Sequence, residues 1–363
     1  MVNTTYSVIK YIHPIMKFST LISAILLSAA AFMDMGNSAQ ACTRVVYAGD
    51  STLRIVGRSL DWKTPIPTNL YVYPRGMQKQ SFFQPNAIKW TSKYGSVYAV
   101  SYDGGITEGM NEKGLSMNGL FCKDSQYTNE TNENNAPMSL AMFIGWVLDL
   151  SATTQEAVDL LNSTPFALGG SKFDGGTAAL LHFGITDPTG DCAIVEFNKG
   201  DMKIYRGQDI PTMTNNPQWP EMQAIRWYWE QVGGTHMLPG TVSSPDRMTR
   251  GTFFTTHVAK TDDADLGMSI TRSIMANVSV PYTYVIEGEP NVSSTQWRSY
   301  SNLRDKRYYF EMVTAHGLYY IDLTKCDLRP GAPVKKLETA KNLDTVGEAN
   351  SHLRTSAPFT PMY

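Results

Sequence analysis

The residue with the clearest capacity for chemistry is Cys42, because it directly follows a stretch with the features of a secretory signal. Lys17 supplies a positive charge, residues 18–32 form an apolar run, and Ala39-Gln40-Ala41 has the small residues of a cleavage site. The apolar run is too short to be a membrane-spanning helix of the mature protein. We therefore expect residues 1–41 to be removed, which would leave Cys42 with a free α-amine beside its thiol.

An N-terminal cysteine would combine a nucleophile and a base in one residue. A thiol with a pKa of about 8.5 is only a few per cent thiolate at neutral pH, and an α-amine with a pKa of about 7.7 can accept its proton. The thiolate would attack an amide carbonyl, the amine would protonate the departing nitrogen, and water would hydrolyse the thioester. Such chemistry also needs an oxyanion hole and polar groups that hold the thiol and the amine in place.

Two other interpretations of Cys42 remain open at this point. Bacterial lipoproteins are also cleaved before a cysteine, although their signals favour Leu three positions earlier, where this chain has Ala39. A lipid-modified Cys42 would make the chain a periplasmic lipoprotein that binds an apolar ligand without catalysis. In the other interpretation, cleavage is imprecise and Cys42 is an inert structural cysteine.

The rest of the sequence argues against several common kinds of site. The chain has 363 residues with 42% hydrophobic residues and a formal charge of −2, which gives no sign of a nucleic-acid footprint or a basic membrane patch. It contains no Walker A or Rossmann glycine pattern. The five histidines outside residues 1–41 are scattered without the spacing of metal ligands: His182, His236, His257, His316 and His352. We therefore expect neither a metal ion nor an organic cofactor.

Cys122, Cys192 and Cys326 are the other cysteines of the chain. Their number is odd, so they can form at most one disulfide among themselves, and a disulfide scaffold is not expected in a chain of this size. We interpret them as small buried apolar residues, because free cysteine is among the most buried residue types.

The elements that must position Cys42 indicate an α+β fold. Short β-rich runs at residues 43–47 and 53–56 predict a hairpin that places Cys42 at the start of a strand, and residues 57–62 would return toward it on the next strand. Further strands are expected at residues 69–73, 94–102, 115–121, 178–186, 192–197, 202–205, 294–300, 307–314 and 318–323, and helices at residues 137–150, 153–161, 220–232, from 244, and 266–276. This order is typical of antiparallel sheets covered by helices, and no linker divides residues 42–363.

Five short blocks make the sequence resemble the choloylglycine hydrolase and penicillin V acylase family of N-terminal nucleophile hydrolases. They are Cys42-Thr43-Arg44, Gly57-Arg58-Ser59-Leu60-Asp61-Trp62, Asn111-Glu112-Lys113-Gly114-Leu115, Thr214-Asn215-Asn216-Pro217 and Ser244-Pro245-Asp246-Arg247. The resemblance implies a four-layer αββα sandwich of two antiparallel sheets between helical layers. It also implies the hydrolysis of a linear amide bond with release of an apolar acyl group.

The resemblance implies a role for each matching residue. Cys42 would be the nucleophile with its own α-amine as base, and Arg58 would favour the thiolate through its positive charge. Asp61 would accept a hydrogen bond from the α-amine. Asn215 would donate its side-chain amide to the oxyanion, and Arg247 would complete the polar network around the nucleophile.

The substrate pocket departs from the family at one position. Family members usually have Asn or Tyr where this chain has Phe121, and the resemblance implies that the backbone N–H at this position is the second oxyanion donor. Trp62, Met117 and Trp219 are further apolar residues near the matched blocks, and we expect them to line the pocket. Such a pocket could accept a steroid acid, a phenoxyacetyl group or a fatty acyl chain, so conjugated bile salts, penicillin V and N-acyl homoserine lactones all remain open as substrates.

The stretch between Asn215 and Arg247 lacks a longer insertion that Gram-positive members carry. This chain therefore resembles the exported Gram-negative branch, which implies a periplasmic or secreted enzyme, and the family tendency implies a homotetramer. Residues 1–15 add nothing that a signal needs, so Met16 is an alternative start to Met1. We expect a small-molecule amide as partner, without stable membrane insertion or nucleic-acid binding.

Overall fold

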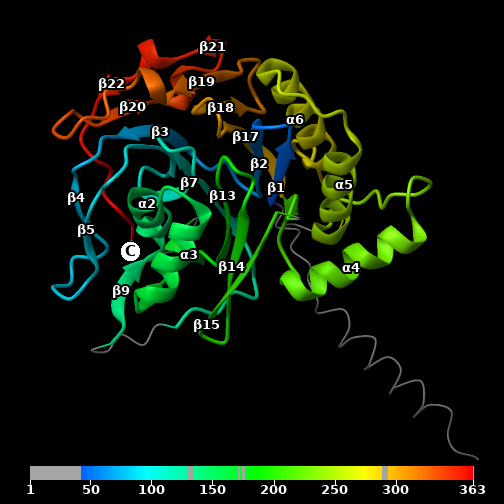
Figure 1. Cartoon of the computed structure of the whole chain (residues 1–363), viewed down its shortest axis with the longest axis horizontal. Coiled ribbons are helices and arrows are strands. Elements are labelled where there is room, and N and C mark those ends of the chain that lie inside the picture. Colours follow the sequence, from blue (N-terminus) through cyan, green and yellow to red (C-terminus); the bar gives the residue numbers. More distant parts are fainter. Residues whose placement is uncertain are drawn as a thin grey trace, which may run out of the picture. The chain divides into compact units, whose positions relative to one another are not determined.

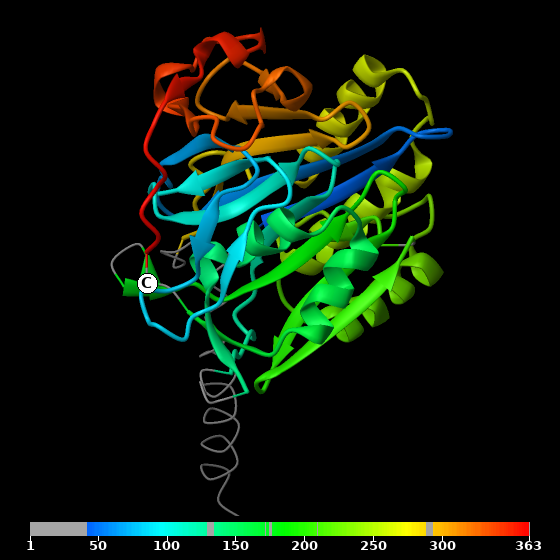
Figure 2. The ribbon, with the colours of Figure 1, turned by 60° about the vertical axis from the view of Figure 1, so that its left-hand side comes forward.

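Two large β-sheets stack face to face, and helices cover the outer side of each (Figure 1). The computed structural model describes residues 42–128, 134–170, 172–173, 176–208, 210–287 and 293–362. The predicted signal at residues 1–41 lies outside the described residues. The predicted αββα sandwich is confirmed, and the strands of both sheets can be followed in the turned view of Figure 2.

The first sheet has seven strands and carries Cys42. Its strands lie in the order β16 (Thr212–Met213), β1 (Cys42–Ala48), β2 (Arg54–Trp62), β17 (Ser294–Asn302), β18 (Arg307–Met312), β19 (Tyr319–Asp322) and β21 (Gly347–Glu348). β1 and β2 form the predicted hairpin, but residues 54–62 are one continuous strand and not two. Cys42 is paired with Leu60, and alternate residues of a strand share a face, so Arg58 lies on the same face as Cys42.

The second sheet has nine strands, and Phe121 ends one of them. The order is β15 (Asp201–Gly207), β14 (Cys192–Asn198), β13 (Leu181–Thr186), β8 (Ser116–Phe121), β7 (Gly105–Asn111), β6 (Ser96–Ser101), β3 (Thr68–Tyr73), β20 (Lys335–Leu337) and β22 (Arg354–Thr355). Three short pairs accompany it: β4 (Gln78–Gln80) with β5 (Lys89–Thr91), β9 (Ala136–Ser139) with β10 (Phe166–Gly169), and β11 (Lys172–Phe173) with β12 (Thr177–Ala178).

Helices pack on the outer face of each sheet. α5 (Ser244–His257) and α6 (Ala264–Val278) lie on the first sheet, α2 (Leu140–Leu150) and α3 (Thr154–Ser163) lie on the second, and α4 (Trp219–Val232) packs against α5. Short 3₁₀ turns occupy η2 (Leu323–Lys325), η3 (Thr339–Lys341) and η4 (Asn350–His352). Apolar side chains form one core between the two sheets and one under each pair of helices.

Side chains cap the starts of α2, α3 and α6, whereas α4 and α5 begin with a proline in the first turn and without a side-chain cap. Thr153 accepts a hydrogen bond from the N–H of Glu156, which is half of the predicted capping box. The helix expected from Pro137 begins only at Leu140, because residues 136–139 pair with β10 as a strand. Ser139 then caps the helix by accepting from the N–H of Ala141.

Candidate active site

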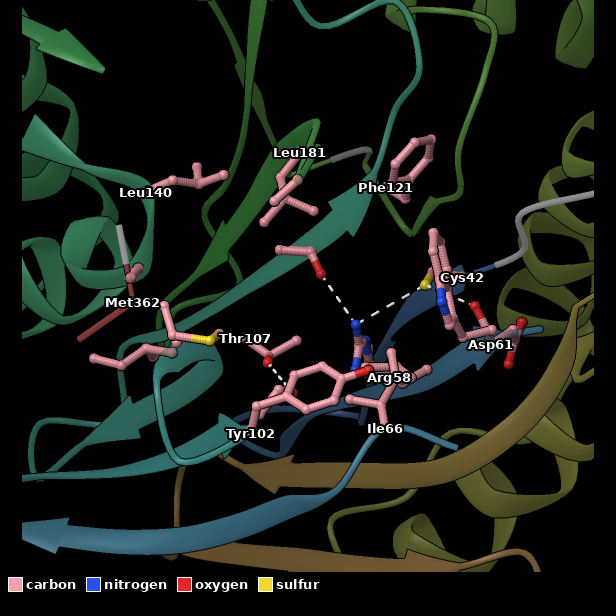
Figure 3. A pocket seen from close by; sticks show the side chains of 18 residues that line it. Cys42, Arg58, Asp61, Ile66, Tyr102, Thr107, Phe121, Leu140, Leu181 and Met362 are labelled. Atoms are coloured by element: carbon pink, nitrogen blue, oxygen red, sulfur yellow. Dashed lines mark hydrogen bonds between the residues drawn. The ribbon is translucent and has the colours of Figure 1, made fainter. Parts of the chain in front are cut away.

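Cys42 lies at one end of a cavity between the ends of the two sheets (Figure 3). It is the first residue of β1, and it is 4% exposed. The cavity has an empty volume of about 720 Å³ and opens to solvent, and its walls are mostly apolar. An apolar cavity that ends at a thiol can hold an apolar acyl group with its carbonyl carbon next to the sulfur.

Arg58 places a positive charge beside the thiol. Its Nη2 lies 3.9 Å from the Cys42 Sγ and 3.1 Å from the carbonyl oxygen of Gly119. Its Nε lies 3.3 Å from the Glu108 Oε2, and its Cζ lies 4.5 Å from the centre of the Trp297 ring. Burial raises the pKa of the Cys42 thiol, and the Arg58 charge opposes that rise.

Glu108 keeps Arg58 in place from the opposite sheet. It is fully buried in β7, and its Oε1 accepts hydrogen bonds from the hydroxyl of Tyr308 at 2.6 Å and from that of Ser299. A buried carboxylate needs such partners, because an unpaired charge in a dry interior is costly. Glu108 was not among the predicted site residues, although a charged residue two positions from the apolar Ile106 and Met110 of one strand is a signal that could have identified it.

The Asp61 carboxylate accepts hydrogen bonds from two hydroxyl groups, and its predicted bond from the α-amine of Cys42 stays a prediction, because that amine exists only after cleavage. Its Oδ1 accepts from Thr295 at 2.6 Å and its Oδ2 from Ser59 at 3.3 Å. The strand register explains the Thr295 contact, because Asp61 is paired with Thr295 on β17. Burial raises the pKa of Asp61 to about 6, although the nearby Arg247 and the Thr295 hydrogen bond both lower it.

The backbone nitrogen of Cys42 donates to Asn215. The distance to the Asn215 Oδ1 is 2.7 Å, and the same oxygen accepts from the Arg247 Nη2 at 2.7 Å. Two donors on one oxygen fix the orientation of the amide, so the Nδ2 points the other way and donates to the carbonyl of Phe121 at 2.7 Å. Asn215 thus connects the start of β1 to the end of β8.

Arg247 ties these groups together from the first turn of α5. Its Nη1 donates to the carbonyl of Cys42 at 2.7 Å and to the hydroxyl of Thr43, and its Nε donates to the carbonyl of Val242 at 2.8 Å. The side chain is completely buried, and burial lowers its pKa while the nearby Asp61 raises it. A guanidinium suits this position because its planar fork donates to several acceptors at once.

Phe121 and Trp62 form the wall of the cavity next to the thiol. Their ring centres are 5.5 Å apart, and both residues line the cavity. Backbone groups of Asp61 and Phe121 lower the pKa of the Cys42 thiol, against the rise that burial causes. The role of the Phe121 backbone N–H as an oxyanion donor stays a prediction.

Two of the predicted pocket residues do not line this cavity. Met117 is fully buried in the core under α2. Trp219 begins α4, where its N–H donates to both oxygens of Glu196 at 3.0 Å. Both predictions rested on closeness in sequence to the matched blocks, which does not reveal the side of a strand or helix on which a residue lies.

The cavity also contains residues that no motif indicated. Leu140, Leu181, Tyr102, Thr107 and Met362 all line it, and they come from distant parts of the chain. Most of these residues are apolar, but so are core residues, so their type alone does not distinguish a cavity wall from a core.

The other cysteines are free thiols, like Cys42. Cys122 and Cys192 are buried and Cys326 is partly buried, and burial raises the pKa of Cys122 to about 12. The part of the chain that the structure describes contains no group of three or more His, Cys, Asp or Glu residues suited to hold a metal ion. In the same part, no helix has the length and apolar character needed to cross a membrane.

Comparison with known proteins identifies the family. The model of the linear amide C–N hydrolases, choloylglycine hydrolase family, matches residues 42–342. The chain belongs to this family. It is therefore an amide hydrolase of the penicillin V acylase and bile salt hydrolase type.

Relatives within the choloylglycine hydrolase family differ in how close they are to this chain. The penicillin V acylase of Pectobacterium atrosepticum is 34% identical over 88% of this chain and 91% of its own length. The bile salt hydrolase/transferase of Bifidobacterium longum is 24% identical over 74% of this chain and 90% of its own length.

Solved structures of family members share the fold, among them a penicillin V acylase and a conjugated bile acid hydrolase. Penicillin V acylase from Agrobacterium tumefaciens has a TM-score of 0.82 and 40% identity, with 88% of this chain and 99% of that chain covered. A mutant conjugated bile acid hydrolase from Clostridium perfringens has a TM-score of 0.70 and 22% identity, with 84% and 98% covered.

Proposed function

We propose that this hydrolase uses Cys42 as an N-terminal nucleophile after cleavage of the bond between Ala41 and Cys42. The observation that carries the proposal is the position of Cys42: it directly follows a signal-type cleavage site, and its thiol lies at the end of an apolar cavity beside Arg58. The Asn215 Oδ1 already accepts a hydrogen bond from the Cys42 nitrogen, so the α-amine released by cleavage would have a partner that orients it.

The contacts around Cys42 support a two-step reaction. The α-amine takes the thiol proton, the thiolate attacks the amide carbon, and the amine returns the proton to the leaving nitrogen. The Phe121 N–H and the Asn215 Nδ2 are the donors for the oxyanion. The Nδ2 has two hydrogens, and only one is needed for its bond to the Phe121 carbonyl. Water then hydrolyses the thioester.

The positive charge of Arg58 has a specific task in this reaction. The thiol is buried, so its ionisation is unfavourable unless a cation lies nearby. Arg58 supplies that cation, and its pairing with Glu108 keeps the guanidinium in place when the cavity is empty. Arg247 has a different task, because it holds the carbonyl of Cys42 and the amide of Asn215.

We propose amides of apolar acyl groups as substrates, with the phenoxyacetyl amide of penicillin V as the preferred one. The relatives named penicillin V acylases are 34% and 40% identical to this chain, whereas those named for bile salts or bile acids are 24% and 22% identical. The aromatic wall of Trp62 and Phe121 next to Cys42 also suits a flat aryl group. Conjugated bile salts and N-acyl homoserine lactones are the competing substrates.

The proposal includes export, because the same cleavage that removes residues 1–41 creates the α-amine. Purified processed protein tests both parts. We expect N-terminal sequencing to begin at Cys42 and an unmodified intact mass. A diacylglyceryl-modified Cys42 would instead support the ligand-binding lipoprotein and overturn the mechanism.

The substrate part is tested with the same preparation. The specificity constant kcat/KM is measured for penicillin V, a conjugated bile salt and an N-acyl homoserine lactone. We expect the highest value for penicillin V. A higher value for either competitor would reassign the substrate while leaving the nucleophile in place.

A further inference from the structure

Met362 lines the cavity at the end opposite to Cys42. Figure 3 shows the two residues at opposite ends, with Tyr102 and Thr107 between them. Met362 lines the cavity, and its backbone N–H donates to the carbonyl of Gly104 at 2.8 Å. Met362 is 181 or more positions away in the sequence from every other residue that lines the cavity, and no motif drew attention to it.

Met362 packs closely against the turn between β6 and β7. A Cβ atom on Gly104 would lie 2.4 Å from the Met362 Cγ, and one on Gly105 would lie 3.9 Å from the Met362 Cε and from the Ala141 Cβ. Ala141 and its neighbour Leu140 begin α2 and line the same cavity. This end of the cavity is therefore built from three segments that are distant in sequence, and the Met362 side chain fills the space between them.

Phe359 holds the segment 356–362 in place. Its buried ring lies 5.8 Å from the Tyr71 ring and 6.0 Å from the Tyr73 ring, and its N–H donates to the Tyr73 hydroxyl at 3.0 Å. The N–H of Ser356 donates to the carbonyl of Val334 at 3.0 Å. Figures 1 and 2 show this segment in red, running from β22 toward α2. The backbone is thus anchored, while the unbranched Met362 side chain can adapt to what it meets.

We infer that Met362 sets the length of the acyl group that this enzyme accepts. The inference rests on the proposed function, in which the acyl carbonyl lies at Cys42 and the chain extends along the cavity. An acyl chain that reaches the far end meets the Met362 side chain and must displace it. Shortening this side chain to alanine removes three heavy atoms, which makes room for two or three further methylene groups.

The size of the effect follows from the burial of methylene groups. Each one buried in the vacated space contributes about 0.8 kcal/mol, which is about fourfold in kcat/KM. Two additional methylene groups should therefore raise kcat/KM by about fifteenfold. The Gly104→Ala substitution should act in the opposite direction, because its new Cβ would push the Met362 side chain away from the turn and further into the cavity.

The test is a length profile measured with straight-chain N-acyl p-nitroanilides of four to twelve carbons. We expect Met362→Ala to move the optimum by at least two carbons and to raise the ratio of long-chain to short-chain kcat/KM by about tenfold or more. Gly104→Ala should shorten the optimum. Thr360→Ala is the matched control, because Thr360 is exposed on the same segment and does not line the cavity, and it should leave the profile unchanged.

A binding measurement separates this inference from the proposed function. Straight-chain carboxylates are titrated calorimetrically into Cys42→Ala with and without Met362→Ala, which reports on the cavity without catalysis. Suppose that Met362→Ala shifts the binding profile but Cys42 turns out not to be needed for hydrolysis. This result would overturn the proposed function and keep the role of Met362. Suppose instead that hydrolysis depends on Cys42 but Met362→Ala changes neither the kinetic nor the binding profile. This result would overturn the role of Met362 alone.

Discussion

The Nη2 of Arg58 lies 3.9 Å from the sulfur of Cys42, and both side chains are buried. The two residues come from neighbouring strands of one hairpin, in which Arg58 is paired with Arg44, two residues after Cys42. Arg58 therefore holds a positive charge next to the Cys42 sulfur, which we propose as the nucleophile. The relationship makes the ionisation of the thiol dependent on Arg58.

Removal of the Arg58 charge should raise the pKa of the thiol. We expect the pH at which iodoacetamide alkylates Cys42 half-maximally to rise by about one unit or more in Arg58→Met. The double variant Arg58→Met with Glu108→Gln avoids leaving the Glu108 carboxylate unpaired and should show the same shift. Arg298→Met removes another partly buried arginine of the same sheet and serves as control. An unchanged alkylation profile in both Arg58 variants would contradict the electrostatic role.

Asp61 should make the stability of the protein depend on pH. Its pKa is about 6 in the folded protein and 3.8 is its ordinary value, so the folded state binds the proton more tightly. Protonation of Asp61 therefore adds up to about 3 kcal/mol to the free energy of unfolding. This contribution is fully present below pH 4 and is lost as the pH rises through 6. We expect Asp61→Asn to flatten the fall in unfolding free energy between pH 4 and 7, as measured by urea denaturation.

Asp262 provides the control for this measurement. It is partly exposed, and the hydroxyl and backbone N–H of Ser51 lower its pKa to about 2. Asp262→Asn should therefore leave the slope between pH 4 and 7 as it is in the parent protein. A steep slope that persists in Asp61→Asn would show that another group is responsible.

Asn215 has an acceptor side and a donor side, and two substitutions separate them. Asn215→Asp keeps an oxygen for the Cys42 nitrogen and for Arg247 but loses the Nδ2 donor. We expect both Asn215→Asp and Asn215→Ala to lower kcat by about 100-fold or more, because an oxyanion donor is lost in each. If Asn215→Asp stays within about tenfold of the parent kcat, the amide does not serve the oxyanion.

Arg247 should matter for stability as well as for catalysis. Its replacement by methionine leaves the buried carbonyl of Cys42 without its closest donor, so we expect a loss of about 3–5 kcal/mol in the free energy of unfolding. The exposed pair of Arg329 with Asp327 offers a comparison, since Arg329→Met should leave the free energy of unfolding nearly unchanged. Equal effects of the two substitutions would show that the Arg247 contacts are not important.

The sequence was informative where local chemistry decides the structure. The turn between residues 47 and 54 predicted the hairpin that brings Arg58 to Cys42, and Ser244-Pro245 marked the helix start that carries Arg247. Contacts between distant segments could not be predicted in this way. The partner of Asp61 is Thr295, which is 234 residues away, and nothing local signals that pairing. Met117 was placed wrongly because its apolar side chain suits a core and a pocket equally well.

The most direct test of the account is the activity of Cys42→Ala after cleavage at the same bond. N-terminal sequencing must first show that the variant begins with residue 42, and Cys122→Ala serves as the matched cysteine control. Hydrolysis of penicillin V is then followed by the release of phenoxyacetic acid. We predict that kcat falls by more than about 10⁴-fold in Cys42→Ala and stays within a few-fold in Cys122→Ala. A processed Cys42→Ala protein with the kcat of the parent enzyme would contradict the central claim.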